Sequence, residues 1–429
     1  MTRRAASMLV SAAALSFSWS VCAQPGVIFD EAQVPRYSLP ALLVMQNGER
    51  VRDAKAWSLR RQEILELYRS EVFGRSPGKP DHLAFTVDSV DKQALGGRAV
   101  RKQVTISFAA GAEGPKMHLL IYLPAGPKKP VPLFLALSFT GNQEVYADPG
   151  IALGDEWVRD KTTRLMGKRH TTEDSRGADA SQWQLDQILQ HGYGLATVNY
   201  ADIEPDFVGG IRYGVRPLFF KPGQTEPAPD EWGAIAAWAW GLSRAMDYLE
   251  TDRDIDARHV AIMGHSRLGK AALWAGAQDT RFSIVISNES GEGGASISRR
   301  DYGERTKDLN TRFPHWFDAN FTKYNEREDQ MPFDSHMLLA LMAPRGLYVA
   351  SAVEDRWSDP RGEFLGAVNA GPAYELLGKK GIGTDEMPGL HQPVGHTVMY
   401  HIRAGKHDVT AYDWEQYLKF ADVQSRAGK

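Results

Sequence analysis

The chain has 429 residues, of which 43% are hydrophobic and 24% are charged, and its formal net charge is −3. A chain of this length can bury one large hydrophobic core or two modest ones. Because the charge balance is close to neutral, the composition gives no reason to expect a nucleic acid or an anionic membrane surface as a partner. The composition is that of an ordinary globular protein.

Residues 1–23 have the pattern of a secretory signal peptide. Arg3 and Arg4 precede an apolar run that ends in Val21-Cys22-Ala23, which fits a signal-peptidase site. The run is too short for a comfortable membrane span. The only cysteine of the chain lies in this segment, so we expect a mature protein without disulfides. We therefore expect an exported protein, periplasmic or secreted, that has no membrane association in its mature form.

Residues 24–97 are expected to form an irregular N-terminal lead-in that packs on the core and carries one helix, at 58–68. Strands and helices alternate over the remainder, residues 98–429, which we expect to form one catalytic domain with insertions. The predicted strands are 99–108, 118–123, 132–139, 194–200, 259–263, 283–286, 347–350 and 397–402. The predicted helices among them are 183–191, 234–248, 266–277, 335–342, 363–377 and 412–420. Continuous apolar strands that alternate with helices predict a doubly wound, mostly parallel α/β sheet.

The motif Gly264-His265-Ser266-Arg267-Leu268-Gly269-Lys270 follows an apolar strand and opens a helix. A serine on such a tight turn has its hydroxyl lifted clear of the sheet, beside backbone N–H groups that can bind an oxyanion. The second glycine comes one residue later than in the usual G-x-S-x-G elbow. The structural alternative is a strand–helix corner without catalytic function. The two cations beside the serine favour catalysis, with Ser266 as the nucleophile.

A serine nucleophile needs a base, and the base needs an acid that fixes its tautomer. Among the histidines, His407 lies between the last predicted strand and the C-terminal helix, where this fold places its base. Asp355 and Glu289 each follow a strand and compete for the role of the acid. A solvated loop histidine, or loop acids paired with nearby cations, are the structural alternatives. The choice between the two acids stays open.

Arg267 is expected to donate its main-chain N–H, and its guanidinium as well, to an oxyanion. Lys270 lies one helical turn after the serine, so its ammonium can reach the same pocket. Segment 138–142 lies where a second oxyanion N–H normally originates. His391, His396 and His401 share no face, so we expect neither a zinc site nor any other cofactor.

Trp357 follows Asp355 by two residues and is placed to stack on a sugar face. Glu304 lies in a charged, glycine-rich insertion after Glu289. Plain surface is the alternative for both residues, and only the following resemblance makes them functional candidates.

Taken together, these residues resemble the bacterial glucuronoyl esterases, members of carbohydrate esterase family 15, whose G-x-S-R-x-G-K signature appears whole in residues 264–270. The resemblance runs from about residue 131 to the C-terminus. It implies an α/β-hydrolase fold and metal-free hydrolysis of 4-O-methyl-glucuronoyl esters that join glucuronoxylan to lignin alcohols. It also implies Ser266 as nucleophile, His407 as base, Arg267 as oxyanion stabiliser, and sugar binding by Lys270, Glu304 and Trp357. Glu289 and Asp355 both match acid positions of the family.

Two alternatives remain. One is a broader carbohydrate esterase of the acetyl xylan type, although acetyl esterases need no cationic sugar clamp. The other is a non-catalytic carbohydrate-binding protein on a hydrolase scaffold, although such a protein usually loses a member of its triad. We expect the protein to act as a monomer on its polysaccharide substrate.

Overall fold

The computed structural model describes residues 26–111, 114–126, 130–160, 163 and 165–427. The predicted signal peptide lies outside the described residues. No helix among the described residues has both the length and the apolar character that a bilayer span requires.

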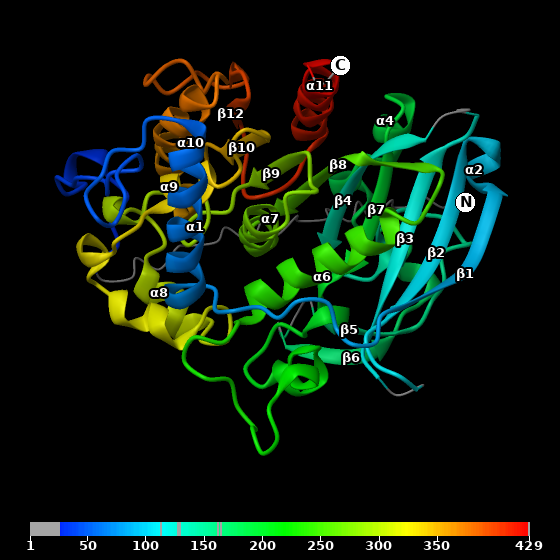
Figure 1. Cartoon of the computed structure of the whole chain (residues 1–429). Coiled ribbons are helices and arrows are strands. Elements are labelled where there is room, and N and C mark those ends of the chain that lie inside the picture. The colour runs from blue at the N-terminus through cyan, green and yellow to red at the C-terminus, as the bar shows by residue number, and fades with distance from the viewer. Residues whose placement is uncertain (1–25, 112–113, 127–129, 161–162, 164, 428–429) are drawn as a thin grey trace, which may run out of the picture.

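One mixed sheet of ten strands dominates the described part of the chain (Figure 1). In spatial order its strands are β1 (Ala84–Gln93), β2 (Ala99–Ser107), β3 (Lys116–Pro124), β7 (Gly194–Asn199), β4 (Val131–Ser138), β8 (Ile255–His265), β9 (Ile284–Asn288), β10 (Gly346–Ala352), β12 (Val398–Arg403) and β11 (Val394–Gly395). The central strands from β7 to β12 run parallel. Antiparallel pairs extend the sheet at both ends. This arrangement confirms the predicted α/β-hydrolase class.

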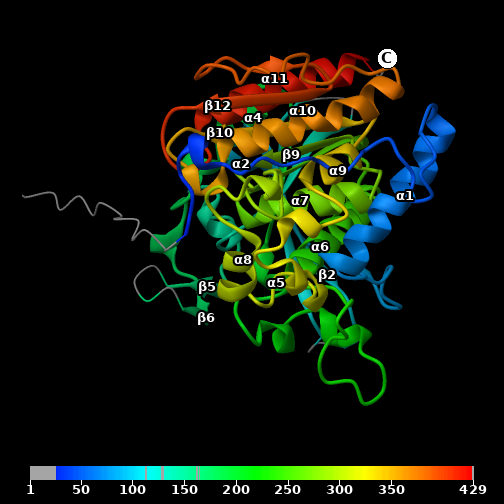
Figure 2. The same ribbon diagram turned by 90° about the vertical axis from the view of Figure 1, so that its left-hand side faces the viewer.

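Helices cover both faces of the sheet. They are α1 (Ala54–Glu71), α2 (Ala94–Gly97), α3 (Ala180–Trp183), α4 (Leu185–Gln190), α5 (Tyr200–Ile203), α6 (Ala234–Leu249), α7 (Arg267–Gln278), α8 (Thr306–Arg312), α9 (Ser335–Ala340), α10 (Pro360–Leu376) and α11 (Ala411–Ala427). Short 3-10 helices lie at Glu31–Gln33, Asn142–Glu144, Glu173–Ser175, Gly210–Tyr213, Arg216–Phe219, Ser298–Arg300, Ala319–Tyr324, Glu328–Gln330 and Arg356–Ser358. Figure 1 shows α6 in front of the sheet, and Figure 2 shows α1 as an outer helix beside α9.

Strand β4 shows why the sheet is buried on both faces. Its odd-numbered Leu133 and Leu135 belong to the larger core, which also contains side chains of α1, α6, α7, α9 and α10. Its even-numbered Phe134 and Ala136 belong to a second core, shared with α4 and α11. Because successive side chains of a strand point to opposite faces, a continuous apolar run fills both cores at once.

Every strand and helix predicted from the sequence overlaps an element of the structure. The description of residues 24–97 as irregular apart from one helix was wrong, because β1 lies there and pairs with β2. The sequence pattern does not reveal β1, because an edge strand needs little burial and six of its ten residues are exposed. The β5–β6 hairpin (Asp155–Arg159 and Met166–His170) was also missed, and it forms a separate two-stranded sheet.

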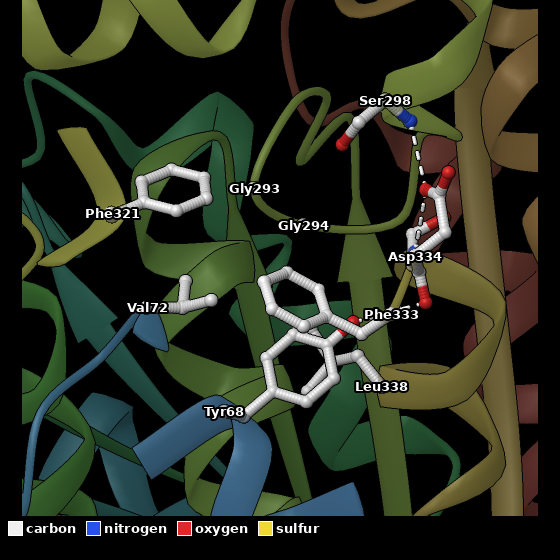
Figure 3. Close-up of a pocket in the computed structure, with 10 residues that line it drawn as sticks. Tyr68, Val72, Gly293, Gly294, Ser298, Phe321, Phe333, Asp334 and Leu338 are labelled. Atoms are coloured by element: carbon white, nitrogen blue, oxygen red, sulfur yellow. Dashed lines mark hydrogen bonds between the residues drawn. The ribbon is translucent and has the colours of Figure 1, made fainter. Parts of the chain in front are cut away.

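A cavity of about 20 Å³ lies next to α1 (Figure 3). The Tyr68 hydroxyl donates to the backbone oxygen of Asp334 at 3.0 Å, and the Ser298 N–H donates to the carboxylate of Asp334 at 2.9 Å. A buried water occupies roughly 10–15 Å³ of such space. This cavity therefore has room for about one water and is far too small for a sugar.

Candidate active site

Ser266 lies on a strained turn between β8 and α7. Its backbone has φ 57° and ψ −131°, a conformation that few residues other than glycine adopt. The Ser266 N–H donates to the carbonyl of Asn288, at the end of β9, at 2.9 Å. A β carbon at Gly264 would lie 2.0 Å from the carbonyl oxygen of Leu268, so only glycine fits there. The tight turn of a nucleophile elbow is therefore present at the predicted serine.

The His407 ring contacts both candidate acids. Its Nδ1 lies 2.6 Å from Oδ2 of Asp355 and 3.0 Å from Oε2 of Glu289. The two carboxylates come from the ends of neighbouring strands, β10 and β9, as the chain order predicted. Both carboxylates therefore contact the same imidazole nitrogen, and either one can serve as the acid of the triad.

Burial and charge act in opposite directions on these groups. Burial alone lowers the pKa of His407, but the hydrogen bonds and charges of Asp355 and Glu289 outweigh it and raise that pKa to about 10. Burial raises the pKa of Glu289 to about 7, in spite of its contact with His407. The pKa of Asp355 is lowered, because its contact with His407 outweighs the effect of burial. Groups this close titrate as a unit.

Arg403 fixes Glu289 and the histidine loop. Its Nη2 donates to Oε1 of Glu289 at 2.6 Å, and its Nε donates to Asp413 at 2.8 Å. The same guanidinium donates to the carbonyls of residues 404, 406 and 408, which flank His407. The N–H of Asp408 donates to the second oxygen of Glu289 at 3.0 Å. Glu289 is therefore a firmly held acid as well as a partner of the histidine.

His265 packs against His407, with the ring centroids 4.4 Å apart. Burial, and then the charge of His407, lower the pKa of His265 to about 3, so its ring is neutral at physiological pH. Ligand atoms of His265, Glu289 and His407 lie within 4.8 Å of one another, the one such grouping in the described residues. Each of the three side chains already has a hydrogen-bonded partner, Asn288 in the case of His265.

Arg267 is held by a carboxylate on one side and by aromatic rings around it. Its Nη1 donates to Oδ2 of Asp206, and its guanidinium carbon lies 4.6 Å from the ring centre of Trp316. The rings of Phe313 and Phe139 lie at 5.3 and 5.8 Å. Phe139 belongs to the segment predicted to supply an oxyanion donor, so that segment lies beside Arg267.

Lys270, Glu304 and Trp357, to which the resemblance assigns sugar binding, lie together in the structure. The Lys270 ammonium is 3.9 Å from Oε2 of Glu304 and donates to the carbonyl of Ser290 at 2.6 Å. Burial lowers the pKa of Lys270, and the charge of Glu304 partly offsets that effect. Arg312 adds a further cation, 3.7 Å from Oε1 of Glu304 and 5.6 Å from the centre of the Trp357 ring. The result is a charged cluster with an aromatic edge, one helical turn from the serine.

Comparisons with known proteins show the family of this chain. A family model described as "Glucuronyl esterase, fungi" matches residues 227–378. The chain is 49% identical to Carbohydrate esterase MZ0003 of an unknown prokaryotic organism over 410 residues, which is 95% of this chain and 94% of that protein. It is 66% identical to the solved glucuronoyl esterase from Solibacter usitatus, with a TM-score of 0.88 over 92% of this chain and 99% of that one. The chain belongs to the family 15 carbohydrate esterases, the glucuronoyl esterases.

A second solved structure of this family is also similar to the chain. A solved promiscuous CE15 esterase from a marine bacterial metagenome is 48% identical, with a TM-score of 0.86 over 93% of this chain and 100% of that one. These findings confirm the resemblance drawn from the signature motif.

Sequence reasoning missed several residues that contact the candidate site residues or their partners. They are Asp206, Arg312, His315, Trp316 and Arg403. Asp206 lies 61 residues from Arg267 along the chain, and no local pattern links the two. Such partners become visible only when the fold brings distant loops together.

Proposed function

We propose that this chain is a serine-type esterase that hydrolyses the ester between a 4-O-methyl-glucuronoyl group and an alcohol, as in esters between glucuronoxylan and lignin. The observation that carries the proposal is the strained Ser266 elbow, with cations on its helix and, packed against the preceding His265, a histidine that contacts two carboxylates. The test compares hydrolysis of methyl or benzyl glucuronate with that of acetylated xylan and of a galacturonate ester. Preference for the glucuronate esters supports the proposal, and preference for acetylated xylan contradicts it.

The proposed reaction has two halves. His407 takes the proton of Ser266 as Oγ attacks the ester carbonyl, and the resulting imidazolium lies against Asp355 and Glu289. The tetrahedral intermediate collapses, the alcohol leaves with the proton of His407, and the glucuronoyl group stays on the serine. Water then attacks the acyl-enzyme with His407 again as the base, which releases glucuronate and restores Ser266.

Arg267 is the proposed oxyanion stabiliser. Its N–H is at the start of α7, next to the serine, and its guanidinium carries a positive charge that Asp206 stabilises despite burial. In a site with little water, fixed donors aimed at developing negative charge contribute strongly to the rate. A fixed cation of this kind favours the anionic tetrahedral intermediate over the neutral ester.

Lys270, Glu304 and Trp357 are the proposed binders of the sugar. A lysine ammonium and a carboxylate can donate to and accept from neighbouring hydroxyls of one ring, and a tryptophan ring packs against the apolar face of a sugar. Arg312 lies over Trp357 and beside Glu304, so it extends this cluster. The ester carbonyl would then lie between the cluster and Ser266.

A broader ester specificity is the second candidate. A relative that is 48% identical to this chain is described as promiscuous, which favours some activity on other esters. The same substrate panel separates the two, because a promiscuous enzyme hydrolyses galacturonate or acetyl esters at comparable rates. Labelling by a serine-reactive phosphonate distinguishes either esterase from a non-catalytic binding protein.

We also propose that the protein is exported and acts as a monomer. The support for export is the n-region, apolar run and small residues of residues 1–23. Mass spectrometry of the N-terminus of protein from periplasm and culture medium tests cleavage after Ala23, and light scattering tests the monomer.

A further inference from the structure

The carboxylate of Asp206 is a buried junction of side chains from separate parts of the chain. Its side chain has no exposed surface. Arg267 and Arg159 donate to Oδ2, as does the Tyr200 hydroxyl at 3.2 Å. The ring nitrogens His315 Nε2 and Trp316 Nε1 lie 2.9 and 2.7 Å from Oδ1. These contacts connect α7, the β5–β6 hairpin, α5 and the loop after α8.

The junction orients the guanidinium of Arg267. Asp206 holds one end of it through Nη1, and Trp316 both donates to Asp206 and stacks under the guanidinium. Nε of Arg267, the nitrogen nearest to the backbone of the elbow, is buried without a hydrogen-bond partner among the described residues. Because an unpaired buried donor is costly, this N–H would gain a partner if the bound ester brought an oxygen to it.

Two guanidinium groups, of Arg267 and Arg159, face a single carboxylate. His315 donates from Nε2 to Oδ1 of Asp206 at 2.9 Å, and its Nδ1 is buried without a hydrogen-bond partner among the described residues. The pKa of Asp206 is strongly lowered, because the charge of Arg267 and the contact with His315 outweigh burial. The carboxylate of Asp206 is therefore ionised and pairs with the guanidinium of Arg267.

We propose that Asp206 is a positioning residue for the esterase reaction: it fixes the Arg267 guanidinium so that Nε–H points to the oxyanion. This inference rests on the proposed oxyanion role of Arg267. Without this anchor the arginine keeps only its aromatic contacts, which do not fix the direction of its N–H groups, and it loses the fixed geometry on which oxyanion stabilisation depends. Asp206 acts through Arg267 and does not itself contact the substrate.

The test is a double-mutant cycle with methyl glucuronate as the substrate. Asp206→Asn keeps the shape but removes the charge and places an amide N–H against the arginine. We expect kcat to fall about 10- to 100-fold, less than the roughly 10²- to 10³-fold loss for complete removal of an oxyanion donor, while KM changes less than about threefold. Arg267→Lys should show a similar loss. If Asp206 acts through Arg267, adding Asp206→Asn to Arg267→Lys should lower kcat less than about threefold further.

Glu204 provides a matched control in the same loop. Its fully buried carboxylate pairs with Arg216 through bonds of 2.5 and 2.6 Å, away from Arg267. Glu204→Gln removes the same kind of buried ion pair, so it should lower the melting temperature and leave kcat unchanged. If Glu204→Gln and Asp206→Asn lower kcat equally, the role of Asp206 is structural and the proposal is wrong.

If Asp206→Asn does not fold, a milder variant tests whether Asp206 positions Arg267. Trp316→Phe keeps an aromatic face under Arg267 but removes one donor to Asp206, and we expect kcat to fall about 3- to 10-fold with KM nearly constant. A folded Asp206→Asn with wild-type kcat, multiplicative losses in the double variant, or an unchanged kcat in Trp316→Phe would each overturn the inference. A wild-type enzyme that fails to hydrolyse methyl glucuronate contradicts the proposed function instead, before any variant is compared.

Discussion

The two acids on His407 make a prediction about the pH dependence of the reaction. The base must be neutral to take a proton from Ser266, so kcat/KM should rise with pH as the imidazolium loses its proton. Asp355 and Glu289, at 2.6 and 3.0 Å from Nδ1, both stabilise the imidazolium and raise the pKa of His407 to about 10. Removal of either charge therefore lowers the pKa of His407, so the rising limb of the plot of kcat/KM against pH moves toward lower pH.

The size of that shift follows from the distances. At about 3 Å and an effective dielectric constant of about 20, one charge pair interacts by about 5 kcal/mol. The His407 side chain is 39% exposed, so solvent screens the pair and about 2 kcal/mol is a more realistic value. Because about 1.4 kcal/mol corresponds to one pH unit, Glu289→Gln or Asp355→Asn should shift the limb by roughly 1–2 units.

The assay is kcat/KM for methyl glucuronate between about pH 5 and about pH 10 for the wild type, both single variants and the double variant. Each single variant should retain more activity than Ser266→Ala, and the double variant should lose more than either, because one acid partly replaces the other. A limb that moves to higher pH would refute the charge argument. If one single variant is as inactive as Ser266→Ala while the other matches the wild type, the triad has one acid.

Further predictions concern the elbow, the oxyanion and metals. Ser266→Ala should abolish ester hydrolysis while circular dichroism and sugar binding stay unchanged, and near-normal turnover would exclude the covalent mechanism. Arg267→Ala should lower kcat roughly 10²- to 10³-fold with a smaller effect on KM, whereas a raised KM at constant kcat would make it a ground-state binder. Gly264→Ala should prevent formation of the elbow, because its β carbon would lie 2.0 Å from a carbonyl oxygen, and a soluble variant with wild-type kcat would contradict this. Activity should persist in EDTA, and loss that a divalent metal restores would overturn the serine mechanism.

The fold could be predicted from the sequence because its central strands carry a strong local signal. A run such as Leu133–Leu137 is apolar at every position, since alternate side chains fill the two cores on opposite faces of the sheet. Strand β1 lacks this signal, because a strand at the edge of the sheet needs few apolar side chains. The β5–β6 hairpin has a short, partly exposed pattern as well, and it stands apart from the main sheet.

In the candidate site, too, some residues could be predicted from the sequence and others could not. Ser266, Glu289, Asp355 and His407 could be found because each follows a strand of a parallel sheet, and strand order alone places their side chains at one edge. The contacts that orient these four side chains could not be predicted from the sequence. Arg403 is the last residue of β12, and nothing in the local sequence indicates that it reaches Glu289, 114 residues away.

The structure explains why the second glycine of the elbow lies at an unusual position in the motif. Gly269 stands one residue later than in the usual motif, and a β carbon there would lie 3.0 Å from both the carbonyl of Gly264 and the side chain of Ser290. Ser290 also offers its carbonyl to Lys270. A small residue at 269 therefore lets α7 lie close to the loop after β9, and that approach is what buries Lys270 beside Glu304. A side chain at 269 would therefore require the carbonyl of Gly264 or Ser290, whose own carbonyl accepts from Lys270, to give way.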